Sequence, residues 1–279
     1  MTLEPAGRLV AEAAAAGRGV AACNMITLEH GEAIIAGAER AGQPVILQIS
    51  QNAVKFHGGR LRPVARAAQA LAEAAPVPVA LHLDHVDRED LLRQAPECGF
   101  GSVMYDASKL PYRDNVAATR SAVRFAHEHG LWLESELGEV GGKDGAHAPG
   151  VRTDPDQAAR FVAETGVDAL AVAVGSRHAM TSRTATLDQD LIRRLREAVA
   201  VPLVLHGSSG VPGGELSRAV RHGMVKINIG TALNLAFTDA VRAHLAENPR
   251  TVDPRRYLSD ARDAMAEVVA GYCRRLAAP

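Results

Sequence analysis

Short apolar segments alternate along this chain with stretches in which apolar residues repeat at helical spacing. The apolar segments lie near residues 20, 46, 81, 103, 133, 171, 204 and 227. They run nearly without interruption, as strands do when both faces of a parallel sheet are buried. Helical patterns between them include residues 63–75, 115–130 and 154–166. In the last one, Asp154 suits an N-cap, Pro155 a first helical residue and Gly166 a stop. Eight strand–helix alternations predict an α/β protein with a (β/α)8 (TIM) barrel.

We expect one domain over residues 1–279, because no linker, charge block or low-complexity stretch divides the chain. Residues 247–276 predict a turn and an additional C-terminal amphipathic helix, packed either on its own barrel or on a second subunit. The glycine-rich stretch 138–152 follows the fifth predicted strand and is a candidate lid, since loops of this length in compact domains are commonly functional.

The composition of the chain mainly argues against certain classes of protein. A net charge of -1 gives no indication of a nucleic-acid or acidic-membrane partner. No apolar run reaches the roughly 18 residues of a membrane span, and charges interrupt the first 19 residues, unlike a signal peptide. The three cysteines are widely spaced, which argues against a disulfide framework. These features predict a cytoplasmic protein.

Three histidines follow predicted strands directly: His85, His178 and His206. A single histidine is more often structural than a ligand, and His82, within its strand, is expected to be a hydrogen-bonded filler of the barrel. Three histidines at the same end of parallel strands predict a site that is built into one face of the barrel. Neutral imidazoles with an open fourth position suit a catalytic zinc ion.

Carboxylates and a glycine-rich loop accompany the histidines. Asp84 would either orient the imidazole of His85 or donate a proton to the substrate. Asp106 and Glu136 would be either structural carboxylates or an oxygen site for a second cation. The loop HGSSGVPGG and the segment KINIGT follow the seventh and eighth strands, where barrels of this type bind phosphate through main-chain N–H groups. A metal, a phosphate site and carboxylates together favour proton and carbon–carbon chemistry beside a carbonyl.

Ordered motifs along nearly the whole chain resemble one family. They include PVALHLDH, GFGSVMYDASKLPYRDN, ESELGEVGG, LVLHGSSGVP, KINIGTAL and DPRRYLSDARDAM. The chain is similar to the class II, zinc-dependent ketose-bisphosphate aldolases, which include the fructose-bisphosphate enzymes of glycolysis and gluconeogenesis. The resemblance implies reversible cleavage of a ketose 1,6-bisphosphate, through a zinc-stabilised enediolate, to dihydroxyacetone phosphate and glyceraldehyde 3-phosphate.

The resemblance also assigns residues. It implies that His85, His178 and His206 bind catalytic Zn²⁺, that Asp84 is the proton donor, and that Asp106 and Glu136 form a second divalent metal position. The implied substrate-binding residues are Asn24, Ser50, Ala179, Gly207, Ser208, Ser209, Asn228, Ile229, Gly230 and Thr231. A monovalent cation, Na⁺ or K⁺, is implied near the phosphate. A homodimer or homotetramer is implied, with Arg255, Arg256 or Arg262 reaching the distal phosphate of a neighbouring subunit.

The chain departs from the family pattern at several positions. Asp144 stands where the family commonly has a catalytic glutamate, and we expect it to be the base. Ala179 and Ser208 replace glycines and can still act through their main-chain N–H groups. Gly230 matches neither the aspartate of many fructose enzymes nor the alanine of tagatose enzymes. Fructose 1,6-bisphosphate is the expected substrate on metabolic generality, and tagatose 1,6-bisphosphate or another ketose phosphate is the alternative.

Three other hypotheses compete with a zinc aldolase. Lys226 on the predicted eighth strand would be the Schiff-base lysine of a metal-independent aldolase. A zinc hydrolase on the same barrel would activate water, although the phosphate loop and the long glycine-rich stretch argue against it. A non-catalytic sugar-phosphate sensor would retain the site without turnover, and Asp144 is the only residue that favours it.

Overall fold

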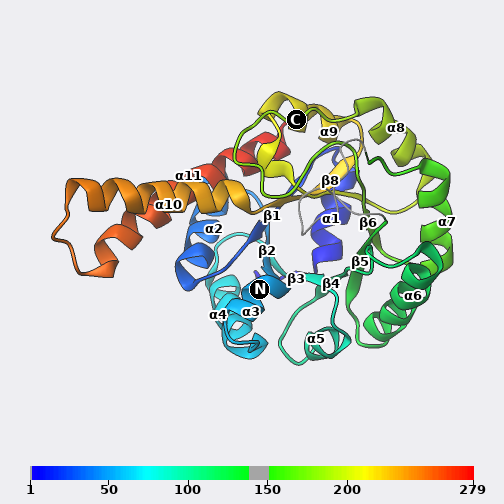
Figure 1. The fold of residues 1–279 in the computed structure, drawn as a ribbon, viewed down its shortest axis with the longest axis horizontal. Helices are drawn as coiled ribbons and strands as arrows, with labels where there is room; N and C mark the ends of the chain where they lie inside the picture. Colours follow the sequence, from blue (N-terminus) through cyan, green and yellow to red (C-terminus); the bar gives the residue numbers. More distant parts are fainter. Residues whose placement is uncertain (1, 138–150) are drawn as a thin grey trace.

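Eight parallel strands close into a barrel in a computed structural model that describes residues 2–137 and 151–279 (Figure 1). Each strand pairs with the next in the chain, and β8 pairs with β1 to close the sheet. The strands are β1 (Val20–Asn24), β2 (Val45–Ser50), β3 (Val79–Val86), β4 (Ser102–Tyr105), β5 (Trp132–Glu136), β6 (Ala169–Ala171), β7 (Leu203–Leu205) and β8 (Met224–Ile229). All eight coincide with the apolar segments of the sequence, which confirms the predicted barrel.

Helices follow the strands and surround the barrel (Figure 1). They are α1 (Ala6–Ala15), α2 (Leu28–Ala41), α3 (Gln51–Phe56), α4 (Leu61–Ala74), α5 (Glu89–Gln94), α6 (Tyr112–Glu128), α7 (Pro155–Thr165), α8 (Gln189–Ala198), α9 (Gly213–Arg221), α10 (Thr231–Glu247) and α11 (Pro254–Ala277), with a 3-10 turn η1 (Ser208–Gly210). The termini of α7 are those that the sequence predicts. Asp154 caps it by accepting a hydrogen bond from the main-chain N–H of Gln157, and Gly166 ends it in the left-handed conformation.

Helix α1 covers the N-terminal ends of the strands. Its apolar residues Leu9 and Val10 form one buried cluster with Val20, Ile46 and Val225, which lie at or near the starts of their strands. One end of the barrel is therefore filled by apolar side chains. The C-terminal ends, where the sequence places its polar residues, remain for chemistry.

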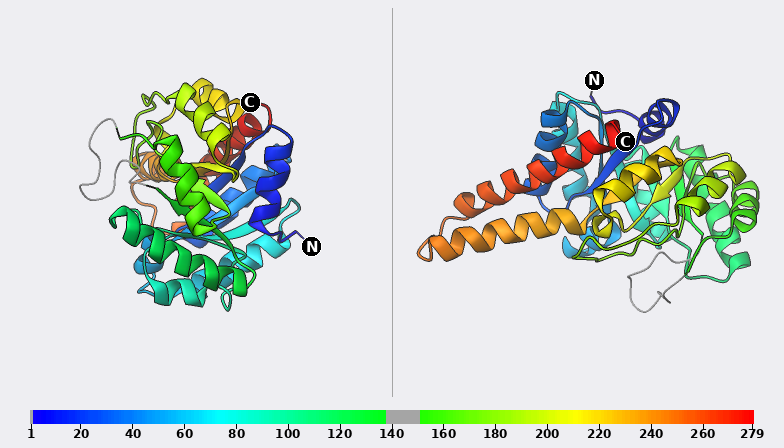
Figure 2. Two further views of the ribbon diagram at one scale, coloured as in Figure 1. Left: turned by 90° about the vertical axis from the view of Figure 1, so that its right-hand side faces the viewer. Right: turned by 90° about the horizontal axis from the view of Figure 1, so that it is seen from above.

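Helices α10 and α11 form an arm that extends away from the barrel (Figures 1 and 2). The last helix, α11, returns along α10 and packs on α2 of its own barrel, with Met265 and Val269 buried. Arg262 of α11 forms an ion pair with Glu32 of α2 at 2.9 Å. The predicted additional C-terminal helix is therefore confirmed, as is its packing on its own barrel. Among the described residues, no helix combines the length and the apolar character needed to cross a membrane.

Candidate active site

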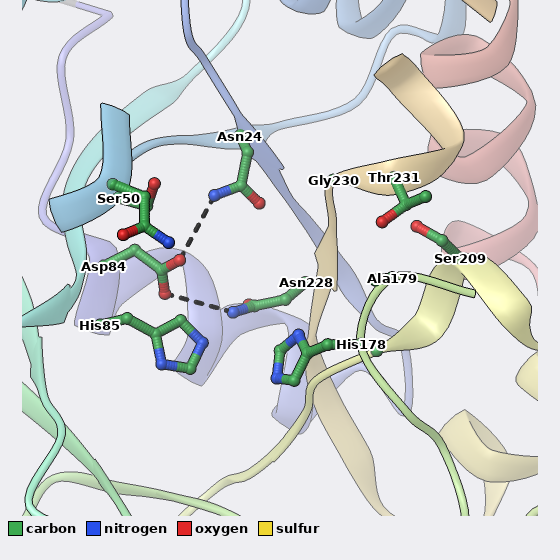
Figure 3. Close-up of a pocket in the computed structure, with 12 residues that line it drawn as sticks. Asn24, Ser50, Asp84, His85, His178, Ala179, Ser209, Asn228, Gly230 and Thr231 are labelled. Atoms are coloured by element: carbon green, nitrogen blue, oxygen red, sulfur yellow. Dashed lines mark hydrogen bonds between the residues drawn. The ribbon is translucent and has the colours of Figure 1, made fainter. Parts of the chain in front are cut away.

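A pocket lies at the C-terminal ends of the strands, at the end of the barrel opposite to α1 (Figure 3). The described residues that line it are Asn24, Ser50, Asn52, Asp84, His85, His178, Ala179, Gly207, Ser209, Asn228, Gly230 and Thr231. All of them except Asn52 are among the site residues that the sequence predicts. Asn52 is in the first turn of α3, whose N-cap Ser50 accepts a hydrogen bond from the main-chain N–H of Ala53. Its place directly after β2 is the signal that would have found it.

The three histidines converge as the sequence predicts: His85 and His178 line this pocket, and His206 is fully buried beside them. His85 lies at the end of β3, His178 in the segment after β6, and His206 directly after β7. Their ring centroids are 5.3 Å apart for His85 and His178, 4.7 Å for His85 and His206, and 5.7 Å for His178 and His206. One ring nitrogen from each lies within 4.8 Å of the other two. This is the spacing at which a single ion could contact all three.

The main chain is unusual at two lining positions. His85 has φ 51° and Ala179 has φ 57°, in the left-handed region that side chains other than glycine rarely occupy. At His85 the pairing of β3 with β4 shifts register between Leu83 and Val86, so the strand is irregular where the histidine leaves it. Such conformations cost about 1–3 kcal/mol each and persist mainly where function requires them. His85 carries one of the three imidazoles, and Ala179 follows directly after another, His178.

Hydrogen bonds determine which nitrogen each of two imidazoles offers. Nδ1 of His85 lies 2.8 Å from Oδ2 of Asp106, and Nε2 of His206 lies 2.9 Å from Oε1 of Glu134. An ionised carboxylate only accepts, so both of these nitrogens carry the proton. The nitrogens left for an ion are Nε2 of His85 and Nδ1 of His206. Burial lowers the pKa of His206, which keeps its ring neutral. Neutral imidazoles oriented by carboxylates are the usual ligands of zinc.

A second group of possible ligands shares His85. His85, Asp106 and Glu136 also bring one ligand atom each within 4.8 Å of one another. Asp106 accepts a further hydrogen bond from the hydroxyl of Ser108 at 2.6 Å. One hypothesis is that Asp84 orients the imidazole of His85. The structure gives this role to Asp106, which accepts the hydrogen bond from Nδ1 of His85. Asp106 and Glu136 also lie close enough together to supply the oxygen ligands that a second cation would need.

Asp84 is buried and held by two amides (Figure 3). Asn24 Nδ2 donates to its Oδ2 at 3.3 Å, and Asn228 Nδ2 donates to its Oδ1 at 3.4 Å. Burial by itself raises the pKa of Asp84. Electrostatic interactions with the neighbouring His85, His206 and Lys226 side chains outweigh burial and hold the pKa below its ordinary value. The carboxylate is therefore ionised at neutral pH and faces the pocket as an acceptor.

The other side of the pocket is built from the segments after β7 and β8. Gly207 has φ 67° and precedes η1, and Gly230 precedes α10, which begins at Thr231. The hydroxyl of Ser209 accepts a hydrogen bond from the main-chain N–H of Ala232 at 3.0 Å, which ties η1 to the first turn of α10. Main-chain N–H groups at the start of a 17-residue helix favour an anion.

Two residues of the predicted substrate site do not contribute side chains to this pocket. Ile229 is fully buried in the apolar core, because Asn228 faces the barrel interior and its neighbour in the strand must face the surrounding helices. Ser208 is also fully buried, and its hydroxyl donates to the main-chain carbonyl of Asn228. Only the main-chain groups of these two residues are available to a ligand, which agrees with main-chain binding of a phosphate, and their place in the substrate site stays a prediction.

Lys226 has a different environment from that of a Schiff-base lysine. Its side chain is fully buried, its Nζ lies 2.8 Å from Oε2 of Glu134, and it donates to Oδ1 of Asn228 at 2.7 Å. An amine that is ion-paired in this way is not a nucleophile. Burial raises the pKa of Glu134, but Lys226 and His206 outweigh burial and bring it down to about 2. Glu134 is not among the predicted site residues, although its position two residues before Glu136 places both on the same face of β5.

Several predictions concern residues away from this pocket. Asp144 and most of the glycine-rich stretch lie outside the described residues. Arg255 and Arg256 begin α11 at the far end of the arm (Figure 1), and Arg262 is paired with Glu32, so none of the three lines the pocket of its own chain. His82 is buried and contacts the hydroxyl of Ser102 at 2.8 Å, which confirms its predicted role as a filler of the barrel.

Comparisons with known proteins agree with this geometry. The family model for class-II fructose-bisphosphate aldolase matches residues 5–278. The fructose-bisphosphate aldolase of Geobacillus stearothermophilus is 40% identical over 255 residues, which cover 90% of this chain and 88% of that protein. The probable fructose-bisphosphate aldolase of Bacillus subtilis (strain 168) is 39% identical over 262 residues, 92% of either protein. The crystal structure of the YdjI aldolase from Escherichia coli K12 matches with a TM-score of 0.85 at 32% identity, covering 99% of this chain and 97% of that one.

Proposed function

This chain belongs to the class II fructose-bisphosphate aldolase family, and on that basis we propose that it cleaves fructose 1,6-bisphosphate reversibly with a zinc ion held by His85, His178 and His206. The family makes it a ketose-bisphosphate aldolase, a metal-dependent lyase that acts on a phosphorylated sugar. The proposed products are dihydroxyacetone phosphate and glyceraldehyde 3-phosphate.

The observation that carries the proposal is the convergence of the three imidazoles. Their ligand atoms lie within 4.8 Å of one another, and two of the rings have their other nitrogen bonded to a carboxylate. Three imidazole nitrogens beside an open pocket are the donor set of a catalytic zinc site. When bound there, the ion would polarise the substrate carbonyl and stabilise the negative charge that develops on it.

We propose that Asp84 handles the proton on the aldehyde side. In cleavage the bond between C3 and C4 breaks, its electron pair stays with C3, and the C4 hydroxyl proton passes to a carboxylate oxygen of Asp84. The ionised state of Asp84 is the one that this step requires. In condensation the same group returns the proton to the new hydroxyl. The base that acts at C3 is proposed to be Asp144, which stays a prediction.

We propose that the dihydroxyacetone phosphate end binds on the side of Gly207, Ser209, Gly230 and Thr231. Main-chain N–H groups of η1 and of the first turn of α10 would hold the phosphate there. Asn24, Ser50, Asn228 and Ala179 would contact the rest of the substrate. Asp106 and Glu136 are proposed as the position of a second divalent ion that shares His85. The monovalent cation also stays a prediction.

A subunit interface on the arm is part of the same proposal. Only Ala232 and Leu233 of α10 are buried within the chain, and apolar Leu245 and Val252 are exposed near its far end. A second chain that covered this surface would give the expected homodimer or homotetramer, and its arm would carry Arg255 and Arg256 toward a neighbouring pocket. Light scattering tests it: Leu245→Glu/Val252→Glu should reduce the mass to that of a single chain, whereas an unchanged mass would place the interface elsewhere.

The activity is tested by a coupled assay on fructose 1,6-bisphosphate and tagatose 1,6-bisphosphate, before and after chelation and with zinc restored. We expect cleavage that chelation abolishes and zinc restores, with fructose 1,6-bisphosphate the faster substrate. A faster rate on tagatose 1,6-bisphosphate would mean that this sugar, and not fructose 1,6-bisphosphate, is the preferred substrate. Binding of either sugar without cleavage by zinc-loaded protein would favour the sensor.

A further inference from the structure

A continuous set of buried and half-buried polar contacts crosses the barrel beneath the pocket. It starts at His206, passes through Glu134, Lys226, Asn228 and Asp84, and continues to Asn24 and Gln48. The contacts in order are His206 to Glu134 at 2.9 Å, Glu134 to Lys226 at 2.8 Å, Lys226 to Asn228 at 2.7 Å, Asn228 to Asp84 at 3.4 Å, Asp84 to Asn24 at 3.3 Å, and Asn24 to Gln48 at 3.0 Å. It joins a proposed metal ligand to the proposed proton-transfer residue, and its central ion pair touches neither the pocket nor solvent.

Glu134 connects the two ends because each of its oxygens has a separate partner. Oε1 accepts the Nε2 proton of His206, and Oε2 faces the ammonium group of Lys226. Both side chains are fully buried. With the proton held on Nε2, Nδ1 of His206 takes part in no hydrogen bond with the described residues and lies 3.6 Å from Oε2 of Glu136, which leaves its lone pair for an ion. A histidine that binds metal takes its tautomer from the partner of its second nitrogen.

Lys226 sets the direction of the Asn228 amide. An ammonium group only donates, so the atom of Asn228 that faces it must be the carbonyl oxygen. The amide NH2 is then turned toward Asp84. Gln48 donates to the carbonyl oxygen of Asn24, whose NH2 faces the other carboxylate oxygen. Both oxygens of Asp84 thus accept from amides, and Lys226 fixes the direction of one of them.

We propose that Glu134 and Lys226 are positioning residues of this aldolase: Glu134 presents Nδ1 of His206 to the metal, and Lys226 holds Asp84 for proton transfer through Asn228. This inference rests on the proposed function, since it assumes that His206 binds the ion and that Asp84 moves the proton. Apolar side chains of similar volume would fill the same space, and a buried ion pair is not required for stability. The pair orients two polar neighbours, His206 through Glu134 and Asn228 through Lys226, and apolar residues at these positions could not do so.

The test compares two double variants in the full-length protein. Replacing only one member would leave a buried charge without its partner and endanger folding, so both members are changed together. Glu134→Gln/Lys226→Met keeps an acceptor for Nε2 of His206, whereas Glu134→Leu/Lys226→Met removes it. Both double variants lack the charges of Glu134 and Lys226, and both lack the ammonium group that donates to Asn228. Ser102→Ala is the control, because it breaks another buried hydrogen bond of the barrel, to His82, without removing a group bonded to Glu134 or Lys226.

Zinc affinity, measured by competition with a chelator, reports on Glu134. We expect Glu134→Leu/Lys226→Met to bind zinc about 10–100-fold more weakly than wild type. Glu134→Gln/Lys226→Met should stay within a few fold, as should Ser102→Ala, and the visible spectrum of the cobalt-substituted protein should change only in the leucine variant. Equal zinc affinities and equal cobalt spectra in the two double variants would overturn the role of Glu134.

Steady-state kinetics at saturating zinc report on Lys226. In Glu134→Gln/Lys226→Met we expect kcat to fall about 10–100-fold while KM changes little, because Asp84 loses its orientation but the substrate keeps its binding groups. A kcat within threefold of wild type would overturn the role of Lys226. The wild-type enzyme separates this inference from the proposed function: if it cleaves neither sugar with zinc bound, the proposed function is wrong, and the affinity comparison still decides the role of Glu134.

Discussion

Gly207 is a position where one added methyl group should disturb the metal site without changing a ligand. Its φ of 67° lies in the left-handed region, where an alanine costs about 1–2 kcal/mol. A Cβ built on it would lie 2.5 Å from the carbonyl carbon, 2.6 Å from the oxygen and 2.9 Å from the nitrogen of Arg177. These are main-chain atoms of the residue that precedes His178, so the contact cannot be relieved by turning a side chain.

The size of the effect follows from that overlap. Ordinary contact begins at 3.4 Å, so the nearest main-chain atom must retreat by 3.4 − 2.5 = 0.9 Å. A displacement of about 1 Å in a catalytic group can cost about 100-fold in rate. For Gly207→Ala we therefore expect kcat/KM to fall by about 100-fold, zinc affinity to weaken, and the free energy of unfolding to drop by at least about 1–2 kcal/mol.

Three measurements on Gly207→Ala check this reasoning: sugar cleavage, zinc competition with a chelator, and urea unfolding. Gly214→Ala is the matched control. Gly214 lies seven residues further on in α9, its φ is not in the left-handed region, and a Cβ there meets no atom within 4 Å. The control should keep its activity and gain about 0.5–1 kcal/mol in stability. Zinc affinity and kcat/KM in Gly207→Ala equal to those of the control would refute the argument that this glycine sets the position of His178.

Three further predictions concern the acids and one buried histidine. Asp84→Asn should lower kcat by about 10²–10⁴-fold in a steady-state assay while zinc affinity stays within a few fold, because the change removes proton transfer and no ligand; an equal loss of zinc affinity would contradict that role. Asp106→Ala should weaken zinc binding about 10–100-fold in chelator competition by releasing Nδ1 of His85, and unchanged affinity would show that the hydrogen bond does not matter. Burial lowers the pKa of His82 from 6.5 to about 3, so between these pH values the unfolded chain binds one proton more than the native protein. His82 should therefore contribute a fall of about 1.4 kcal/mol per pH unit to the free energy of unfolding of the metal-free protein as pH decreases across this range, measured by urea unfolding, and His82→Asn should show a slope smaller by that amount. An identical slope in the variant would mean that His82 is protonated in the native protein.

The fold was readable from the sequence because burial on both faces leaves a simple pattern. The eight apolar segments became the eight strands, and Asp154, Pro155 and Gly166 marked the ends of α7 through local geometry alone. The apolar segment near residue 171 did not indicate the length of its strand, β6. Only Ala169–Ala171 form β6, although the apolar residues continue to Val174, because burial continues where strand pairing does not.

The site was partly readable for the same reason. Residues at the ends of parallel strands meet whatever the details of packing, so the three histidines and Asp84 could be placed together. Glu134 could not be connected to His206, because they are 72 residues apart and their contact depends on side-chain packing across the barrel. The left-handed conformation of His85 follows from an irregular strand, which no residue pattern indicates. Which groups of Ile229 and Ser208 face a ligand could not be predicted, because main-chain and side-chain roles look alike in a sequence motif.

A zinc titration of the metal-free protein tests the central claim most directly, with bound zinc and the rate of fructose 1,6-bisphosphate cleavage measured in the same samples. If His85, His178 and His206 hold the catalytic ion, activity should be absent without metal and should rise in proportion to zinc until one ion is bound per chain. Any further ion at the group of His85, Asp106 and Glu136 should add little. Full activity in the metal-free protein, or one bound zinc ion per chain without cleavage, would contradict the account.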